Sequence, residues 1–222
     1  NESESIKKFV NQINNISIDG VEISVVFLED GSTDDTLEVL RILCKEFKFV
    51  KYYSLRNDFG QYFALFFGIT KSDADAVITM DVDGGHPLQI IENMIQEYLS
   101  GYNVVQGHRV QYKQKENYRA VASYLYNLFF LIVIGLNLVK QNSIFRLMDR
   151  LSYGKFRENF LLGYSLKTNF IKSDNVRVQY TSYDSPEREL GVSKYNFFRL
   201  ARLSVRVAFS QLSNQRFLLL ML

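Results

Sequence analysis

The sequence is poor in cysteine and nearly balanced in charge. Its one cysteine, Cys44, excludes an internal disulfide framework, and no Cys/His cluster with the spacing of a zinc site occurs. This composition is compatible with a reducing, cytosolic location. The 26 basic and 24 acidic residues leave a formal charge of only +2, which argues against a general nucleic-acid-binding protein. Any electrostatic role must therefore be local.

The chain also lacks a recognisable signal peptide, an internal repeat and a low-complexity linker. With 222 residues, 47% of them hydrophobic, it can bury a full core and is expected to form one domain rather than two. It begins with Asn1 rather than methionine and stops at Leu222 inside the apolar run FLLLML. We expect both ends to be cuts in a longer protein.

The first half of the chain alternates helical and strand-like hydrophobic patterns. This is the βαβ alternation of a doubly wound, mostly parallel α/β sheet with helices on both faces. Because such a fold rarely opens on a helix, a first strand is expected upstream of Asn1. The expected helices span 6–13, 33–47, 61–70 and 88–99, and the expected strands span 21–28, 49–55, 74–80 and 103–106.

An apolar run ends in two aspartates in the segment AVITMDVDGGHP, residues 76–87. Asp81 and Asp83 follow a β-favouring stretch, and ligands of α/β sheets bind at the carboxyl ends of strands. Two carboxylates there, followed by glycines that allow close backbone approach, suit a hard divalent cation that carries a substrate's phosphates. The alternative is a surface turn, which is the stronger interpretation of an isolated pair, since Asp and Gly are common turn residues.

A second acidic turn, EDGSTDDT, follows the expected strand at 21–28. Ser32 or Thr33 can cap the next helix, with carboxylates in its first turn favoured by the helix dipole. Capping leaves Glu29 and Asp30 unexplained, and a carboxylate at this strand end could accept hydrogen bonds from a nucleotide's base or ribose. Polar groups that follow the next strand, Arg56 among them, would lie on the same rim of the sheet.

Six motifs occur in the order that is typical of one enzyme family. They are EDGSTDDT, LRNDFGQYFALFFGI, DADAVITMDVDGGHP, VVQGHR, FRLMDR and ERELGVSKY. The chain thereby resembles the family 2 glycosyltransferases, in the branch of dolichol-phosphate mannosyltransferase and the bacterial polyprenyl-phosphate glycosyltransferases. The resemblance covers nearly the whole chain, and Asn1-Glu2 matches the end of the family's opening YNE motif. It implies a GT-A (Rossmann-like) fold, expected over residues 1–195, with a nucleotide-sugar donor bound across the strand ends.

The resemblance implies a donor site and a metal site. Asp30 is similar in position to the aspartate that contacts the nucleotide, and Arg56 would lie near it. Asp81 and Asp83 look like the pair that holds Mg²⁺ or Mn²⁺, which would neutralise the donor diphosphate as a Lewis acid. The family usually has a glutamine that completes the metal shell where this chain has Gly85. Reduced metal affinity or lost activity is therefore one expectation.

Basic residues in the second half resemble the family's phosphate-binding positions. Arg109 lies in VVQGHR and follows the short strand expected at 103–106. Arg119 and Ser123 are four residues apart in a helical pattern, so a guanidinium and a hydroxyl could both meet an acceptor phosphate. For any single basic residue, the alternative is a solvated side chain. The loop that closes over donor and acceptor phosphates in the family is matched by Arg188, Ser193 and Lys194.

A phosphate acceptor needs little help from a base. A polyprenyl phosphate has a second pKa of about 6, so its oxygen is largely anionic at neutral pH and has only to be positioned. We therefore interpret His86 as positional, although histidine is the usual general base near neutral pH. The expected reacting-centre residues are Asp83, Arg109, Arg119, Ser123 and Arg188, and the expected donor-binding residues are Asp30, Arg56, Asp81, Ser193 and Lys194.

The segment FRLMDR, residues 145–150, is less easily assigned to a role. It resembles a family segment beneath the active site, with Arg146 and Asp149 either paired to each other or holding the acceptor loop. Family members often carry an aspartate a few residues earlier, where this chain has Gln141-Asn142. This difference favours a phosphate acceptor over a hydroxyl acceptor, which requires a base.

Two apolar segments point to a membrane surface. Residues 124–139 carry no charge over 16 positions, which is short for a span and suits a core or interfacial helix, expected over 118–139. Arg199, Arg202 and Arg206 share one helical face in 196–222, as in an amphipathic juxtamembrane helix on anionic lipid. A helix packed on the domain with a solvated arginine stripe is the alternative. FLLLML could begin a transmembrane segment.

These features together predict a metal-dependent, inverting transfer of one sugar from a nucleotide-sugar donor to a dolichyl or undecaprenyl phosphate at the cytoplasmic membrane face. Nucleic acid is not an expected partner, and a homo-oligomer is compatible with the sequence. Two alternatives stay open. One is a family 2 transferase that acts on a saccharide hydroxyl. The other is a catalytically impaired homologue that binds nucleotide or lipid as a partner subunit, motivated by Glu29, Gly85 and Gln89.

Overall fold

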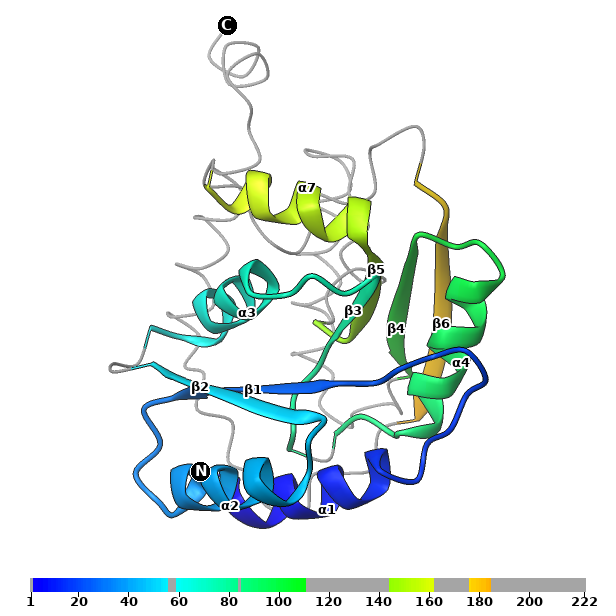
Figure 1. Ribbon diagram of the computed structural model, residues 1–222. Coiled ribbons are helices and arrows are strands. Elements are labelled where there is room, and N and C mark those ends of the chain that lie inside the picture. Colours follow the sequence, from blue (N-terminus) through cyan, green and yellow to red (C-terminus); the bar gives the residue numbers. More distant parts are fainter. Residues whose placement is uncertain (1, 56–58, 84, 111–143, 162–175, 185–222) are drawn as a thin grey trace, which may run out of the picture.

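The computed structural model describes residues 2–55, 59–83, 85–110, 144–161 and 176–184 (Figure 1). From α1 to β4 helices and strands alternate along the chain, as the sequence predicts for its first half. The helices are α1 (Ser3–Ile13), α2 (Thr36–Glu46), α3 (Gln61–Thr70), α4 (Gln89–Leu99) and α7 (Arg150–Leu161). The strands are β1 (Val25–Asp30), β2 (Val50–Leu55), β3 (Ala76–Thr79), β4 (Val104–Val110), β5 (Arg146–Asp149) and β6 (Val178–Asp184).

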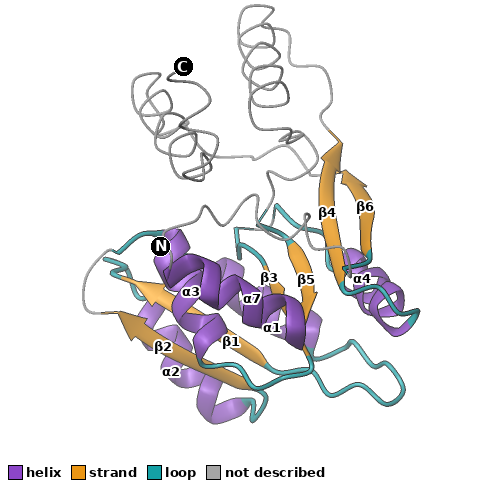
Figure 2. Cartoon of the chain, turned by 90° about the horizontal axis from the view of Figure 1, so that it is seen from above, coloured by secondary structure: helices purple, strands orange, loops and turns teal. Residues whose placement is uncertain are grey.

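The strands form two sheets. β1 and β2 pair in parallel, with Val25 opposite Val50 and Asp30 opposite Leu55 (Figure 2). The second sheet has the order β3-β5-β4-β6 and is mixed, since β5 runs antiparallel to both β3 and β4 while β4 and β6 are parallel. The prediction of an α/β fold is confirmed, and parallel pairing occurs in both sheets. Hydrophobic periodicity predicted neither β5 nor β6.

Helices cover both faces of the β1–β2 pair. α1 and α2 lie on one side of these strands and α3 on the other (Figure 1). α1 buries Ile6, Val10 and Ile13, which recur at helical spacing and so face the core together. The core on this side also contains Phe27 of β1 and Leu40 of α2. The amphipathic pattern read from the sequence therefore sets which face of each helix is buried.

The mixed sheet is also covered on both faces. Val105 of β4 packs in one apolar cluster with Met94 of α4. Its neighbour Val104 packs in another cluster with Tyr153 of α7. Because successive residues of a strand point to opposite faces, α4 covers one face of this sheet and α7 the other.

A glycine lets β4 and β5 meet closely beside the larger cluster. A Cβ at Gly107 would lie 2.8 Å from the Phe145 ring and 2.9 Å from the Phe145 carbonyl oxygen. The Gly107 amide donates to that same oxygen at 2.9 Å, and the Gln106 side-chain amide donates to it at 3.2 Å. The glycine in VVQGHR thus has a packing reason, and Phe145, which is fully buried, is held in place.

The predicted membrane-interface helices, 118–139 and 196–222, lie outside the described residues. So does the end of the predicted GT-A domain at residue 195. No helix in the part of the chain that the structure describes is long and apolar enough to cross a membrane.

Candidate functional site

The beginning of α3 brings two of the predicted aspartates together. Asp30, the last residue of β1, accepts hydrogen bonds from the backbone amides of Phe59 at 3.0 Å and Gly60 at 2.8 Å. The next residue, Gln61, donates from its side-chain amide to Asp81 Oδ1 at 2.6 Å. Consecutive residues at one helix N-terminus therefore hold carboxylates that are far apart in sequence. As the polar motifs predict, the end of β1 and the segment after β3 meet at one rim.

Gly60 makes this arrangement possible through its backbone. It stands at the N-cap of α3 with φ of 84° and ψ of 154°, a conformation that residues with a side chain rarely adopt. A Cβ at this position would meet nothing within 4 Å, so conformation rather than space requires glycine. This turn aims the Gly60 amide at Asp30.

Asp83 forms a tight local turn. Its Oδ1 accepts the backbone amide of Gly85 at 3.0 Å, and a Cβ at Gly85 would lie 3.0 Å from the same oxygen. This is the aspartate turn that the alternative interpretation of the pair anticipated. A turn and a metal site are compatible, because a carboxylate has two oxygens with about four lone-pair sites between them. Both Asp81 and Asp83 are half-buried.

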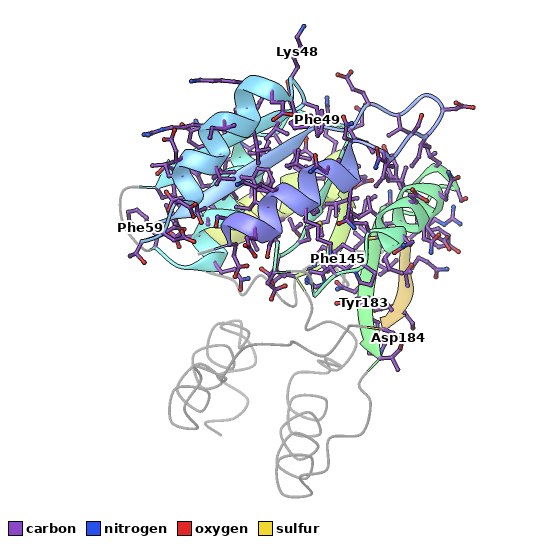
Figure 3. All side chains as sticks on the ribbon, turned by 90° about the horizontal axis from the view of Figure 1, so that it is seen from below. Lys48, Phe49, Phe59, Phe145, Tyr183 and Asp184 are labelled. Atoms are coloured by element: carbon purple, nitrogen blue, oxygen red, sulfur yellow. The ribbon has the colours of Figure 1, made fainter. Side chains whose placement is uncertain are left out.

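His86 is packed into an aromatic cluster beside Asp81. Its ring stacks on Phe145 with centroids 4.5 Å apart, and its Nδ1 lies 3.0 Å from the hydroxyl of Tyr183 on β6. Its Nε2 is 4.0 Å from Asp81 Oδ2, and the His86 side chain is only 11% exposed. Phe145 and Tyr183 lie near each other in Figure 3, with ring centroids 5.5 Å apart. A ring held this closely suits a positional role.

Glu29 hydrogen-bonds within the protein rather than lying open to a nucleotide at the end of β1. It is buried, and it accepts hydrogen bonds at 2.5 Å from the Ser32 amide and from the hydroxyl of Ser54, its register partner on β2. Burial is the largest single influence and raises its pKa, but the hydrogen bonds from Ser54, Ser32 and Gly31 together outweigh burial. The pKa is therefore lowered. Glu29 joins β1 to β2, and Asp30 alone of the two reaches the rim.

The start of α2 also differs from the prediction. The helix begins at Thr36, and the carboxylate of Asp34 accepts the Thr36 amide at 3.1 Å, so neither Ser32 nor Thr33 is the capping residue. The pKa of Asp34 is lowered chiefly by a hydrogen bond from the Thr36 side chain, and the Thr36 amide adds to this effect. Ser32 is instead drawn toward Glu29, a contact that local sequence does not reveal.

Arg109 lies within β4 rather than after it. The strand continues to Val110, because it pairs in parallel with β6, and Arg109 is opposite Tyr183 in that pairing. The prediction that Arg109 follows the strand is therefore wrong, since β6 extends the pairing beyond the apolar residues. The remaining predicted site residues lie outside the described residues: Arg56, Arg119, Ser123, Arg188, Ser193 and Lys194.

The FRLMDR segment contains β5 and the start of α7. Asp149 Oδ1 accepts the Ser152 amide at 2.7 Å, and its Oδ2 accepts the Asn103 side chain at 2.7 Å. Arg146 is buried and lies three residues earlier on the strand, so it points to the opposite face of the sheet. The two residues therefore do not pair with each other. Asp149 directly precedes α7, accepts an amide of its first turn, and ties this helix start to the residue before β4.

The pair of aspartates fits a divalent cation in its donor chemistry. Among the described residues, no group of three or more His, Cys, Asp and Glu side chains could hold a metal ion. Mg²⁺, and Mn²⁺ with its similar preference for oxygen, is commonly bound through one or two carboxylates plus a substrate's phosphates. Asp81 and Asp83 supply two hard oxygen donors on one short segment, which is this kind of partial site.

Sequence reasoning missed three contributors to the site. Gln61 and Gly60 stood inside a recognised motif without a role, and the only local signal was a glycine directly before a helical pattern. Tyr183 carried no signal at all, because its contact with His86 depends on how β6 is placed in the sheet. Long-range contacts of this kind have no periodic signature in the sequence.

Comparison with known proteins gives a consistent result. The family model described as glycosyl transferase family 2 matches residues 1–157. The chain is 31% identical over 201 residues to the glycosyltransferase CsbB of Bacillus subtilis (strain 168), which covers 89% of this chain and 57% of CsbB. It is 28% identical over 212 residues to the bactoprenol glucosyl transferase of Shigella phage SfV, with 92% of this chain and 67% of that protein covered.

Another relative has a named lipid phosphate substrate. The undecaprenyl-phosphate 4-deoxy-4-formamido-L-arabinose transferase of Proteus mirabilis (strain HI4320) is 26% identical over 188 residues, which are 82% of this chain and 56% of that protein. The chain thus spans between 56% and 67% of the length of these three relatives.

A solved structure shows the fold. Glucosyl-3-phosphoglycerate synthase from Mycobacterium tuberculosis, crystallised with Mn²⁺, UDP-glucose and phosphoglyceric acid, aligns with a TM-score of 0.61 at 17% identity. The alignment covers 97% of this chain and 76% of that one. The similarity confirms the expected GT-A-like arrangement of the α/β fold.

Proposed function

The chain belongs to glycosyl transferase family 2, and from this premise we propose that it transfers one sugar from a nucleotide-sugar donor to a polyprenyl phosphate. The transfer inverts the anomeric carbon by direct displacement and depends on Mg²⁺ or Mn²⁺. The observation that carries the proposal is the meeting of Asp30 and Asp81 at the start of α3. It supports the proposal because the carboxylate proposed to contact the nucleotide and the carboxylate proposed to bind the metal are held by consecutive residues.

In the proposed donor site, Asp30 has two tasks. Its carboxylate holds the turn at Phe59 and Gly60 through backbone amides, and the same group accepts hydrogen bonds from the base or ribose of the donor. The N-terminus of α3 adds the positive end of a helix dipole, which favours a bound anion. Nucleotide and diphosphate can then be recognised on adjacent parts of one surface.

In the proposed metal site, Asp81 and Asp83 hold the cation. A bound Mg²⁺ or Mn²⁺ supplies Lewis-acid stabilisation of the charge that develops on the leaving diphosphate. Gln61 and His86 orient Asp81 from two sides, and the Gly85 amide orients Asp83. The protein's own contribution is therefore a pair of carboxylates whose rotamers are set before the donor arrives.

The proposed acceptor is a lipid phosphate held by positive charge. Two of the relatives are named for transfer to bactoprenol and to undecaprenyl phosphate. Phosphate binding is assigned to Arg109, Arg119, Ser123, Arg188, Ser193 and Lys194 by their motif positions. The apolar segments 118–139 and 196–222 would bring this site to the cytoplasmic face of the membrane.

The test is a direct transfer assay with the full-length protein. Labelled GDP-mannose, UDP-glucose and UDP-linked amino sugars are each incubated with undecaprenyl or dolichyl phosphate and Mg²⁺ or Mn²⁺, and the lipid fraction is analysed for a glycolipid. Undecaprenol without its phosphate serves as the acceptor control. We expect one donor to give product with the phosphate only. The proposal fails if no donor gives product or if Asp83→Ala transfers sugar as well as the wild type.

A second candidate function is suggested by Gly85. If the chain is an impaired partner subunit, nucleotide binding will tighten with Mn²⁺ while no sugar is transferred to any acceptor. Gly85→Gln restores the family residue, but its Cβ meets Asp83 Oδ1 at 3.0 Å. We expect this substitution to shift Asp83 and weaken Mn²⁺ binding by about 10-fold rather than improve it, at the low end of what displaced supporting groups cost metal sites. Tighter Mn²⁺ binding and new transfer activity in Gly85→Gln would instead support the impaired-subunit hypothesis.

A further inference from the structure

We propose that Tyr183, acting through His86, positions Asp81 for the metal and the donor diphosphate. This inference rests on the proposed function, because it assigns a supporting role in the same site. It concerns a residue on β6 that lies far along the chain from the aspartate motif. Tyr183 is a positioning residue in this scheme, since it acts on Asp81 through the imidazole.

The contacts form a continuous path from the sheet to the aspartate. The Tyr183 hydroxyl lies 3.0 Å from His86 Nδ1, which is a hydrogen-bonding distance. On the other side of the ring, His86 Nε2 is 4.0 Å from Asp81 Oδ2. That distance exceeds a direct hydrogen bond but keeps the imidazole and the carboxylate within electrostatic contact.

The His86 ring is packed between two aromatic rings. His86 stacks on Phe145 at 4.5 Å with an interplanar angle of 30°, and the Tyr183 ring meets its edge at 5.6 Å and 70°. Phe145 is itself fully buried and anchored through its carbonyl to Gly107. Tyr183 is 5% exposed and sits in the β4–β6 pairing. The imidazole therefore has little freedom to turn away from Asp81.

The two contacts of the imidazole together favour one of its tautomers. A neutral histidine has one donor and one acceptor nitrogen, and the partner of one nitrogen decides the role of the other. When the Tyr183 hydroxyl donates to Nδ1, the hydrogen resides on Nε2 and faces the Asp81 carboxylate. The opposite tautomer would place a lone pair toward that carboxylate, which is unfavourable. The Asp81 carboxylate, which only accepts, favours hydrogen on Nε2, and the Tyr183 hydroxyl, which can donate or accept, supports this tautomer by donating to Nδ1.

Two side chains from different parts of the chain consequently face the Asp81 carboxylate. Gln61 at the start of α3 occupies Oδ1 at 2.6 Å, and His86 faces Oδ2. Groups that orient a metal-binding carboxylate typically contribute about 10- to 100-fold in metal affinity. The fold can therefore set the direction of Asp81 before any cation binds, and β6 takes part through Tyr183.

The experiment measures Mn²⁺ binding by electron paramagnetic resonance, with Mn²⁺ alone and with Mn²⁺ plus UDP or GDP, on the full-length protein. Tyr183→Phe removes only the hydroxyl and keeps the packed ring. Tyr180→Phe is the matched control, because it removes the same group from the opposite face of β6. We expect Mn²⁺ to bind about 10-fold more weakly to Tyr183→Phe and equally well to Tyr180→Phe. Equal Mn²⁺ affinity in Tyr183→Phe and the wild type overturns the proposal.

Two substitutions at His86 separate positioning from packing. His86→Gln keeps a donor near the place of Nε2, whereas His86→Asn keeps a group only near Nδ1. We expect His86→Gln to retain more Mn²⁺ affinity than His86→Asn, and Tyr183→Phe to have no further effect on Mn²⁺ binding in the His86→Asn background. The proposal is refuted if the two substitutions weaken Mn²⁺ binding additively in the double variant. A lower melting temperature without any change in Mn²⁺ affinity would likewise show a purely structural role.

Asp81→Asn distinguishes this inference from the proposed function. If Asp81→Asn and the wild type bind Mn²⁺ equally, the proposed metal site is itself refuted, and the positioning role falls with it. If Asp81→Asn loses Mn²⁺ binding while Tyr183→Phe does not, only the role of Tyr183 is refuted.

Discussion

Asp30 and Asp81 are held at the same rim by different kinds of partner. Asp30 accepts two backbone amides, from Phe59 and Gly60, whereas Asp81 faces two side chains, from Gln61 and His86. Backbone donors depend on chain conformation and tolerate changes of side chain. Side-chain donors depend on the particular residues and on the packing behind them. The nucleotide half of the site should therefore be sensitive to backbone strain, and the metal half to individual side chains.

The largest expected effect separates the two aspartates directly. We expect Asp81→Ala to lower the rate of sugar transfer by about 10³-fold, because loss of a metal ligand removes several kcal/mol of charge stabilisation. Mn²⁺ binding should be lost in parallel. Asp30→Ala should instead weaken nucleotide binding while leaving the affinity for Mn²⁺ alone unchanged. Calorimetric titration with Mn²⁺ and with UDP or GDP checks both, and a loss of Mn²⁺ affinity in Asp30→Ala would contradict the division.

A glycine substitution tests the backbone side of the comparison. Gly60→Ala introduces a side chain at φ of 84° and should cost about 1–3 kcal/mol of stability while moving the amide that Asp30 accepts. We expect nucleotide binding to weaken with little change in Mn²⁺ binding.

Gly20→Ala is the matched control for that substitution. Gly20 has a similar φ of 74°, and its Cβ would likewise meet nothing within 4 Å. It should therefore lower the melting temperature by a comparable amount without any effect on nucleotide affinity. Equal effects of the two substitutions on nucleotide binding would show that Gly60 has no special link to Asp30.

A substitution at Gln61 tests the side-chain donors that hold Asp81. Gln61→Ala removes the donor 2.6 Å from Asp81 Oδ1 and leaves the helix start with a good helix former. We expect Mn²⁺ to bind about 10-fold more weakly, since the Asp81 carboxylate loses its hydrogen bond from the Gln61 side chain. Nucleotide binding measured without metal should be unchanged. An unaltered Mn²⁺ affinity would show that Gln61 does not set the direction of Asp81.

We expect the smallest effect on sugar transfer from a substitution of Glu29, which is buried and joins β1 to β2. Its pKa is lower in the folded protein than the ordinary value of 4.5, so the ionised carboxylate stabilises the fold above that value, and the stabilisation is lost as the pH falls through the folded pKa. Glu29→Gln should lower the free energy of unfolding by about 1–3 kcal/mol at neutral pH, because buried hydrogen-bonding groups lose their partner. Urea denaturation should show this difference shrinking below pH 4.5. A difference that grows on acidification would contradict the assignment.

The predicted elements differ in accuracy for a physical reason. α3 begins and ends where the pattern placed it, at Gln61 and Thr70, because a glycine precedes a continuous apolar stretch. β4 was predicted too short and β5 and β6 were not predicted, since these strands owe their extent to partners in the sheet. The helix cap expected at Ser32 or Thr33 was wrong because α2 begins only at Thr36, whose amide donates to Asp34.

By itself, the sequence determined the alternation of helices and strands, the acidic groups that end β1 and follow β3, and membership of family 2. These properties follow from local periodicity and from the order of motifs, which survive without knowledge of the fold. Only the tertiary structure decided that α3 holds Asp30 and Asp81 together and that Tyr183 reaches His86. Such contacts join distant parts of the chain, and packing of the two sheets and their helices determines which distant side chains meet.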